Sequence, residues 1–290
     1  MRRRALLASA SARLAEAGVS SPEYDAGTLL AHVLGVPRGS LVLVDDVADS
    51  DARALDALIA RRAAREPLQH LTGVAHFRHV ELAVGPGVFV PRPETELLAG
   101  WAIEACDRLE RPVVVDLCTG SGAIAKAIAH EVPRAEVHAV ELSPDAHDWA
   151  DRNLEGTGVD LRLGDAFEAF DELAGQVDVV VCNPPYIPLE AWESVAPEAR
   201  DHDPHLALFS GDDGLDAMRR LADRAALLLK PGGVLGAEHA DEQGPSAADG
   251  GAAGVFADAR RGGSAGRWTD IRDHEDLAGR PRFVTARLAR

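Results

Sequence analysis

Apolar side chains recur every three or four positions through residues 1–66, which places them on one face of each of three helices. Ser21-Pro22 is typical of a helix start, and Gly35 and Pro67 are typical of helix ends. Ser50 is expected to cap the third helix. The three apolar runs are Leu6, Leu7, Ala10, Leu14 and Ala17, then Leu29, Leu30, Val33 and Leu34, then Leu55, Leu58 and Ile59. Residues 1–73 are therefore predicted to form a small helical bundle that is a domain of its own.

The apolar pattern changes to alternation between residues 67 and 90, where we place the domain boundary. Apolar side chains alternate with polar ones over residues 77–84, as in a strand. Gly85-Pro86-Gly87 then supplies a turn signal, and residues 88–90 return as a second apolar run. We therefore predict a β-hairpin within a linker of residues 74–96, followed by a helix that runs through Trp101.

From residue 112 onward, short apolar strands alternate with helices. The predicted strands are residues 113–117, 136–140, 159–163, 177–182 and 234–238, and the predicted helices are residues 122–131, 144–153 and 213–229. Alternation of this kind is typical of a parallel sheet covered by helices on both faces. Residues 267–288 suit a final antiparallel hairpin, and the Gly- and Ala-rich segment 244–266 is predicted to be a loop. Residues 97–290 are therefore expected to form one α/β domain with a Rossmann-like sheet.

The turn after the first strand has the composition of a ligand-binding turn. Its residues are Cys118, Thr119, Gly120, Ser121 and Gly122. Glycines let a ligand approach the backbone, and the helix that follows offers unpaired N–H groups. The third glycine of a dinucleotide-binding fingerprint is absent, which weakens the pyrophosphate interpretation. A plain tight turn is the alternative.

Acidic side chains follow the next two strands at the same sheet edge. Glu141 ends the second strand, where a carboxylate can accept hydrogen bonds from both ribose hydroxyls. Capping of the next helix, which Ser143-Pro144 would begin, is the alternative role for this acid. Asp165 and Ala166 follow the third strand, near the expected position of an adenine ring. The three strand ends together predict an adenosyl pocket.

The fourth strand ends in a motif that suits chemistry at nitrogen. The motif consists of Asn183, Pro184, Pro185 and Tyr186. Prolines remove two backbone donors and stiffen the loop, while the Asn183 side chain adds a carbonyl acceptor. Two acceptors can hold both N–H bonds of a substrate –NH₂ group and aim its lone pair at an electrophilic methyl group. The Tyr186 ring offers a flat surface for a planar amide or base. The motif therefore predicts methyl transfer to an amide or amino nitrogen; a proline-rich turn with a buried tyrosine is the alternative.

Charge and cysteine content limit the partners and the cellular location that we expect for the protein. Residues 1–80 hold 10 of the 30 basic and 9 of the 47 acidic side chains, so the remainder carries a net charge of −18. Such an acidic region argues against stable nucleic-acid binding. The three cysteines show no Cys-x-x-Cys spacing, and no run of about 18 apolar residues exists. We therefore expect a cytoplasmic protein with no membrane partner and no bound metal.

Several segments together resemble the bacterial peptide chain release factor glutamine methyltransferases, the HemK-like protein-(glutamine) N-methyltransferases. The segment of residues 90–96, Val-Pro-Arg-Pro-Glu-Thr-Glu, resembles the signature loop of that family. The other similar segments are residues 66–73, 116–125, 183–188, 207–215 and 276–283. The chain departs from the family pattern at Cys118, which stands in place of glycine, and at Glu141, which stands in place of aspartate. Residues 238–240, Glu-His-Ala, differ from the usual Glu-Ile-Gly, and the segment 244–266 matches the family poorly.

The resemblance implies a class I methyltransferase fold, S-adenosyl-L-methionine as the cofactor, and class 1 peptide chain release factors as the partners. The methylated atom would be the side-chain amide nitrogen of the glutamine in their Gly-Gly-Gln motif. It implies that Asn183 and the Pro184 carbonyl hold this amide, with Tyr186 packing nearby, and that Asn183 also faces the cofactor. Residues 118–122, Glu141 and the Asp165–Ala166 region would bind the cofactor, and residues 1–73 would recognise the substrate. A ribosomal-protein glutamine methyltransferase and an adenine amino methyltransferase of DNA or RNA are the alternatives.

Overall fold

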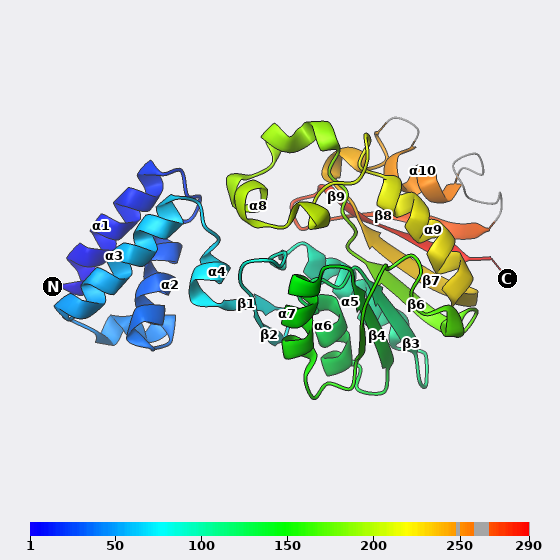
Figure 1. The fold of residues 1–290 in the computed structure, drawn as a ribbon, viewed down its shortest axis with the longest axis horizontal. Helices are drawn as coiled ribbons and strands as arrows, with labels where there is room; N and C mark the ends of the chain where they lie inside the picture. Colours follow the sequence, from blue (N-terminus) through cyan, green and yellow to red (C-terminus); the bar gives the residue numbers. More distant parts are fainter. Residues whose placement is uncertain (248–249, 258–266, 290) are drawn as a thin grey trace. The chain divides into compact units, whose positions relative to one another are not determined.

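The computed structural model describes residues 1–247, 250–257 and 267–289 (Figure 1). The chain forms two compact units. The first unit consists of Met1–Val74, Val84–Pro86 and Ala196–His202, and the second consists of Ala75–Ala83, Gly87–Val195 and Asp203–Arg290. We call them the helical unit and the catalytic unit. In the described part of the chain, no helix has the length and apolar character needed to cross a bilayer.

The three long helices of the helical unit, α1 (Arg3–Glu16), α2 (Pro22–Leu34) and α3 (Asp49–Ala63), pack against one another. The shorter helices of this unit within residues 1–73 are η1 (Arg38–Leu43) and α4 (Leu68–Thr72). Leu14, Leu29, Leu30 and Ile59 form part of its apolar core, as their helical spacing predicted. The expected cap of α3 was wrong: the helix begins at Asp49, so Ser50 lies inside the first turn.

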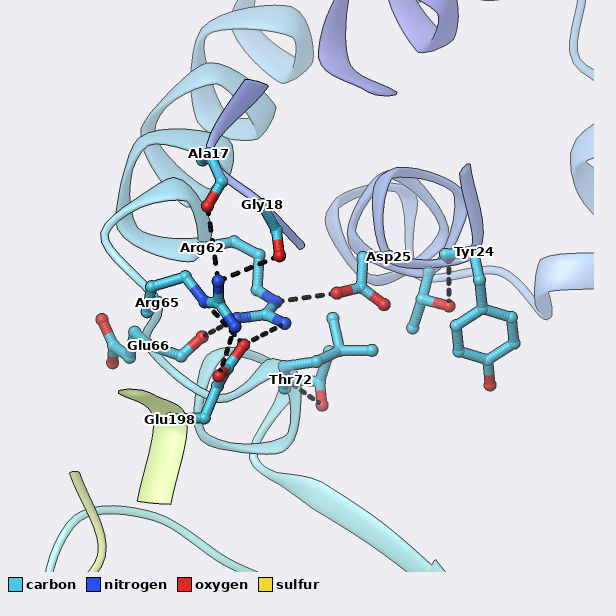
Figure 2. Close-up of polar contacts among 11 residues, drawn as sticks. Ala17, Gly18, Tyr24, Asp25, Arg62, Arg65, Glu66, Thr72 and Glu198 are labelled. Atoms are coloured by element: carbon cyan, nitrogen blue, oxygen red, sulfur yellow. Dashed lines mark hydrogen bonds and ion pairs between the residues drawn. The ribbon is translucent and has the colours of Figure 1, made fainter. Parts of the chain in front are cut away.

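A buried cluster of charges ties residues 196–202 to these helices (Figure 2). The segment contains the short helix α8 (Pro197–His202). Arg62 pairs with Asp25 at 2.7 Å and with Glu198 at 3.0 Å, and Arg65 pairs with Glu198 at 2.7 Å. The side chains of Arg62 and Asp25 are only 7% and 8% exposed. Glu198 thus links this segment to two arginines that lie far from it in the sequence.

The catalytic unit is built on a seven-stranded sheet with the strand order β5-β4-β3-β6-β7-β9-β8. The strands are β3 (Val113–Leu117), β4 (Glu136–Glu141), β5 (Asp160–Leu163), β6 (Val177–Cys182), β7 (Leu229–Glu238), β8 (Trp268–Glu275) and β9 (Pro281–Leu288). The first five of these are parallel, and β8 and β9 pair as the antiparallel hairpin expected near the end of the chain. Because the strand order reverses between β3 and β6, ligands are expected at the carboxyl ends of these two strands.

Helices cover both faces of this sheet, as the alternating pattern predicted (Figure 1). On one face, Trp101 and Leu98 lie so close to Gly236 of β7 that a Cβ atom at this position would clash with them. On the other face, Leu235 of β7 belongs to the same apolar core as Leu221. The long helices are α5 (Thr95–Cys106), α6 (Ala123–Glu131), α7 (Pro144–Leu154) and α9 (Asp216–Leu228). The short ones are η2 (Asp171–Leu173), η3 (Leu189–Ser194), η4 (His205–Ala207), η5 (Asp241–Gln243) and α10 (Gly251–Ala257).

Two sequence-based expectations about irregular segments were wrong. The hairpin strands are β1 (Val74–Phe77) and β2 (Val80–Ala83), so the chain turns at Arg78 rather than at residues 85–87. Arg78 adopts the left-handed φ of 50°, and its guanidinium binds Glu131 at 2.7 Å, which anchors this turn. The expected loop 244–266 contains the helix α10, because Val255 and Phe256 are buried. Positions 248–249 and 258–266 of that expected loop lie outside the described residues.

Candidate active site

The glycine turn follows β3 directly and adopts an unusual backbone. The φ angles of Cys118, Gly120 and Gly122 are 62°, 57° and 82°, all in the left-handed region. Glycine adopts this region at no steric cost, whereas the cysteine must be held there by its surroundings. Apart from its two chain neighbours, no described residue has an atom within 4 Å of the place that a Gly120 Cβ would take, so the backbone is open to a ligand at this residue. Thr119 and Ser121, between these residues, are buried.

Asp116 is buried beneath this turn and holds it in place. Its Oδ2 accepts hydrogen bonds from the Thr119 hydroxyl at 2.6 Å and from the Ala125 N–H at 3.2 Å. Its Oδ1 is buried without a hydrogen-bond partner among the described residues. Burial raises the pKa of the Asp116 carboxyl to about 7, and the two hydrogen bonds offset only part of this effect. The free acceptor fits a cationic or N–H donor on a bound ligand, a role that the sequence analysis did not assign to Asp116.

Glu141 connects the end of β4 to the glycine turn. One carboxylate oxygen accepts the Gly120 N–H at 2.9 Å, and the other accepts the Ser143 N–H at 2.8 Å. Each oxygen retains a lone pair that can accept a further hydrogen bond. The Glu141 carboxylate is therefore bound to the glycine turn and can still accept hydrogen bonds from a diol. The helix that follows is capped by the Ser143 hydroxyl, which accepts a hydrogen bond from the Ala146 N–H at 3.4 Å.

Asp165 is bound within its own turn. Its two carboxylate oxygens accept hydrogen bonds from the Phe167 N–H and from Arg220, both at 2.9 Å. The Arg220 guanidinium lies over the Phe167 ring, 4.1 Å from the ring centroid. Ala166 is buried in the apolar core of the sheet. A hydrogen bond from the Gly164 N–H to the Glu141 carbonyl, at 2.8 Å, joins this turn to the end of β4.

The Asn-Pro-Pro-Tyr loop follows β6, the strand next to β3. Leu117 and Cys182, the last residues of the two strands, are partners in the strand register. The glycine turn and this loop therefore leave the sheet side by side, where the strand order reverses. Pro184 is buried, and Asn183, Pro185 and Tyr186 are half-buried.

Side chains from distant parts of the chain hold the loop. The Asn183 Nδ2 donates to the Thr95 hydroxyl at 3.3 Å, and this hydroxyl donates to Glu238 at 2.7 Å. The Tyr186 hydroxyl also donates to Glu238, at 3.1 Å. Gln243 donates to the Tyr186 carbonyl at 2.9 Å. The sequence analysis assigned no role to Thr95, Glu238 or Gln243, although Glu238 ends a parallel strand at the same sheet edge and could have been noted on that ground.

Two family models match the chain. The one described as the PrmC N-terminal domain matches residues 5–73, and the one described as a methyltransferase domain matches residues 114–202. Among solved structures, the hMettl16 catalytic domain in complex with the MAT2A 3′UTR hairpin 6 is 14% identical, with a TM-score of 0.53. That comparison covers 85% of this chain and 84% of the other, and it shows a shared fold.

Relatives of known name match almost the whole chain. The release factor glutamine methyltransferase of Streptomyces coelicolor is 60% identical over 98% of this chain and 97% of its own. The proteins of the same name from Mycolicibacterium smegmatis and Deinococcus radiodurans are 46% and 43% identical, each over 100% of this chain and 99% of their own.

The expectations of a class I methyltransferase fold and of S-adenosylmethionine as the cofactor are confirmed. The left-handed glycine turn, the carboxylate of Glu141 and the unpaired oxygen of Asp116 fit this cofactor, because they offer an open backbone and acceptors for hydroxyl and ammonium groups. The protein is a methyltransferase, and the chain belongs to the release factor glutamine methyltransferase family.

Proposed function

We propose that this protein transfers the methyl group of S-adenosylmethionine to the side-chain amide nitrogen of the glutamine in the Gly-Gly-Gln motif of class 1 peptide chain release factors. The observation that carries the proposal is the Asn-Pro-Pro-Tyr loop beside the glycine turn at the point where the strand order reverses. Membership of the release factor glutamine methyltransferase family supports the choice of substrate. We also propose a cytoplasmic location, since the three cysteines are free thiols.

The loop would prepare a poor nucleophile for methyl transfer. An amide nitrogen is unreactive because its lone pair is delocalised into the carbonyl group. The Asn183 Oδ1 and the Pro184 carbonyl would each accept one N–H bond of the glutamine amide, and the Tyr186 ring would pack nearby. The two acceptors would orient the lone pair toward the sulfonium methyl and favour its pyramidal form. The proton would leave the nitrogen after transfer, so no strong base is needed beforehand.

The other proposed site residues would hold the cofactor. Residues 118–122 would accommodate it at the open backbone of Gly120, and Glu141 would accept the ribose hydroxyls. Asp165 and Ala166 would lie near the adenine ring. When bound, S-adenosylmethionine supplies the electrophilic methyl group.

We further propose that residues 1–73 select the protein substrate while the catalytic unit performs the chemistry. The helical unit has an apolar core of its own, and none of the proposed site residues belongs to it. Selection by this unit would make an intact release factor a better substrate than a short peptide that carries only the Gly-Gly-Gln motif.

The substrate is tested by supplying labelled S-adenosylmethionine with purified release factor, ribosomal proteins, DNA and a Gly-Gly-Gln peptide in parallel. We expect label in the glutamine of the release factor, with a much higher kcat/KM than for the peptide. Label mainly in a ribosomal protein or in adenine would overturn the proposed substrate. Equal kcat/KM for the factor and the peptide would overturn the role of residues 1–73 alone.

Cofactor affinity is expected to depend on Glu141. Glu141→Ala should weaken S-adenosylmethionine binding by about 1.5–3 kcal/mol, because two charge-assisted hydrogen bonds to the ribose are lost. Glu141→Asp keeps the charge and should bind nearly as well as the wild type. Calorimetric titration measures the affinities, and Glu136→Ala at the exposed start of the same strand is the matched control. Unchanged affinity in Glu141→Ala would contradict the ribose assignment.

A further inference from the structure

We propose that Thr95 and Glu238 are positioning residues that determine which end of the Asn183 amide faces the substrate. This inference rests on the proposed function, since it gives Asn183 its role as an acceptor. Thr95 begins α5, Glu238 ends β7, and Asn183 follows β6. Thr95 and Glu238 are 4% and 1% exposed, so water does not compete for their hydrogen bonds.

Hydrogen-bond direction is fixed at Glu238. An ionised carboxylate only accepts hydrogen bonds, and each of its two oxygens has a hydroxyl partner. The Tyr186 hydroxyl donates to Oε1 at 3.1 Å and the Thr95 hydroxyl donates to Oε2 at 2.7 Å. While Glu238 is ionised, both hydroxyl protons are therefore directed to its carboxylate.

The direction of the Thr95 hydroxyl bond determines the orientation of the Asn183 side-chain amide. The Thr95 oxygen has no second proton to donate, so toward Asn183 it can only accept. Asn183 must then present Nδ2 to Thr95, as it does at 3.3 Å. The two ends of an asparagine amide have nearly the same shape, so hydrogen bonding rather than packing must distinguish them. With Nδ2 held by Thr95, Oδ1 is the end that remains for a substrate N–H group.

Protonation of Glu238 would remove this control. A neutral carboxyl group donates one hydrogen bond, so the Thr95 proton would become free to turn toward Asn183 and to favour the opposite amide orientation. Burial raises the pKa of Glu238, and the Thr95 bond, the nearby Arg282 cation and the Tyr186 bond oppose this effect, whereas Glu94 adds to it. The rate of methyl transfer should therefore fall on the acid side as Glu238 takes up a proton.

Thr95→Val tests the inference because it removes the hydroxyl and nearly preserves the shape. We expect kcat to fall about 10- to 100-fold, since a misdirected acceptor no longer orients the nucleophile. The affinity for S-adenosylmethionine should stay nearly unchanged, because Thr95 bonds to Asn183 and Glu238, whereas the glycine turn and Glu141 hold the cofactor from other strands. Thr95→Ser, which restores the hydroxyl, should recover most of the rate. Wild-type kcat in Thr95→Val, or a Thr95→Ser rate as low as that of Thr95→Val, would overturn the inference.

Glu238→Gln distinguishes control of direction from mere packing. Glutamine keeps the shape but donates from one end, so one of the two hydroxyls must reverse its hydrogen bond. We expect a lower kcat and the loss of the acid limb that the inference predicts for the pH profile of the wild type. An acid limb that persists at the same pH in Glu238→Gln would overturn the role of Glu238.

The side-chain amide signal of Asn183 supplies a readout that does not depend on turnover. In protein labelled with ¹⁵N at asparagine, the Asn183 NH₂ resonance should shift with pH in the wild type and lose that response in Glu238→Gln. This response would support the inference even if the wild type methylated none of the offered substrates, an outcome that would defeat only the proposed function. No response in the wild type across the acid limb would defeat the inference alone.

Discussion

Asn183→Ala is expected to lower the single-turnover rate of methyl transfer by about 10²–10³-fold, the usual cost of losing one oriented transition-state contact. The substitution removes the side-chain acceptor and leaves the substrate nitrogen free to rotate its lone pair away from the methyl group. S-adenosylmethionine affinity should largely survive, because the glycine turn and Glu141 leave the sheet from other strands. The rate is measured with saturating cofactor and a release-factor substrate.

Asn183→Asp is the matched comparison because it keeps an acceptor in the same place. It adds a negative charge beside the sulfonium, which should stabilise the cationic ground state more than a transition state in which this charge is being neutralised. Aspartate also cannot donate to Thr95, whose proton is directed to Glu238. We expect the order wild type, Asn183→Asp, Asn183→Ala. Near wild-type turnover in Asn183→Ala would mean that the active site lies elsewhere.

Features encoded by short stretches of sequence could be predicted. Five parallel strands, the helical stripes within residues 1–66 and the loop at Asn183 each depend on neighbouring positions, and local patterns report them directly. The last predicted parallel strand was too short, because β7 begins at Leu229 rather than at residue 234. Gly232 and Gly233 weaken the apolar pattern at its start although they lie within the strand.

The contacts that complete the candidate site could not be predicted from local patterns. Thr95 and Glu238 are 143 positions apart, and Arg62 and Glu198 are 136 apart. No periodicity relates such residues, since their proximity follows from the strand order and from the packing of distant segments within each unit. The turn at Arg78 was missed for a related reason: Gly85-Pro86-Gly87 is the stronger local signal, whereas Arg78 is anchored by Glu131 on α6.

Arg62→Met should destabilise the helical unit by about 3 kcal/mol, the second large effect that we expect. Methionine has a similar length but leaves the buried Asp25 carboxylate without the guanidinium that it binds at 2.7 Å (Figure 2). Glu198 would keep only Arg65 as its cationic partner. The matched control is Arg13→Met, because the Arg13–Asp56 pair is largely exposed and should contribute less than about 1 kcal/mol.

In the wild type, lowering the pH should reduce the stability that the same charge cluster gives to the fold. Burial opposes ionisation of Glu198, but hydrogen bonds from Arg65 and Arg62 outweigh it and lower the pKa of Glu198 to about 2. A carboxyl whose pKa is lower in the folded than in the unfolded state stabilises the fold above its unfolded pKa of 4.5, and this contribution is lost as the pH falls toward 2. Arg62→Met should raise the pKa of Glu198 and reduce this acid-sensitive contribution.

The two units can be followed separately during unfolding. All four tryptophans, Trp101, Trp149, Trp192 and Trp268, belong to the catalytic unit, so their fluorescence reports on that unit, whereas far-ultraviolet circular dichroism reports on the helices of both. In urea, Arg62→Met should show a circular-dichroism transition that begins well before the fluorescence change, and Arg13→Met should follow the wild type. A common shift of both signals would mean that Arg62 stabilises the whole chain as one cooperative system. No shift in either signal would mean that the buried pair with Asp25 contributes nothing net to folding.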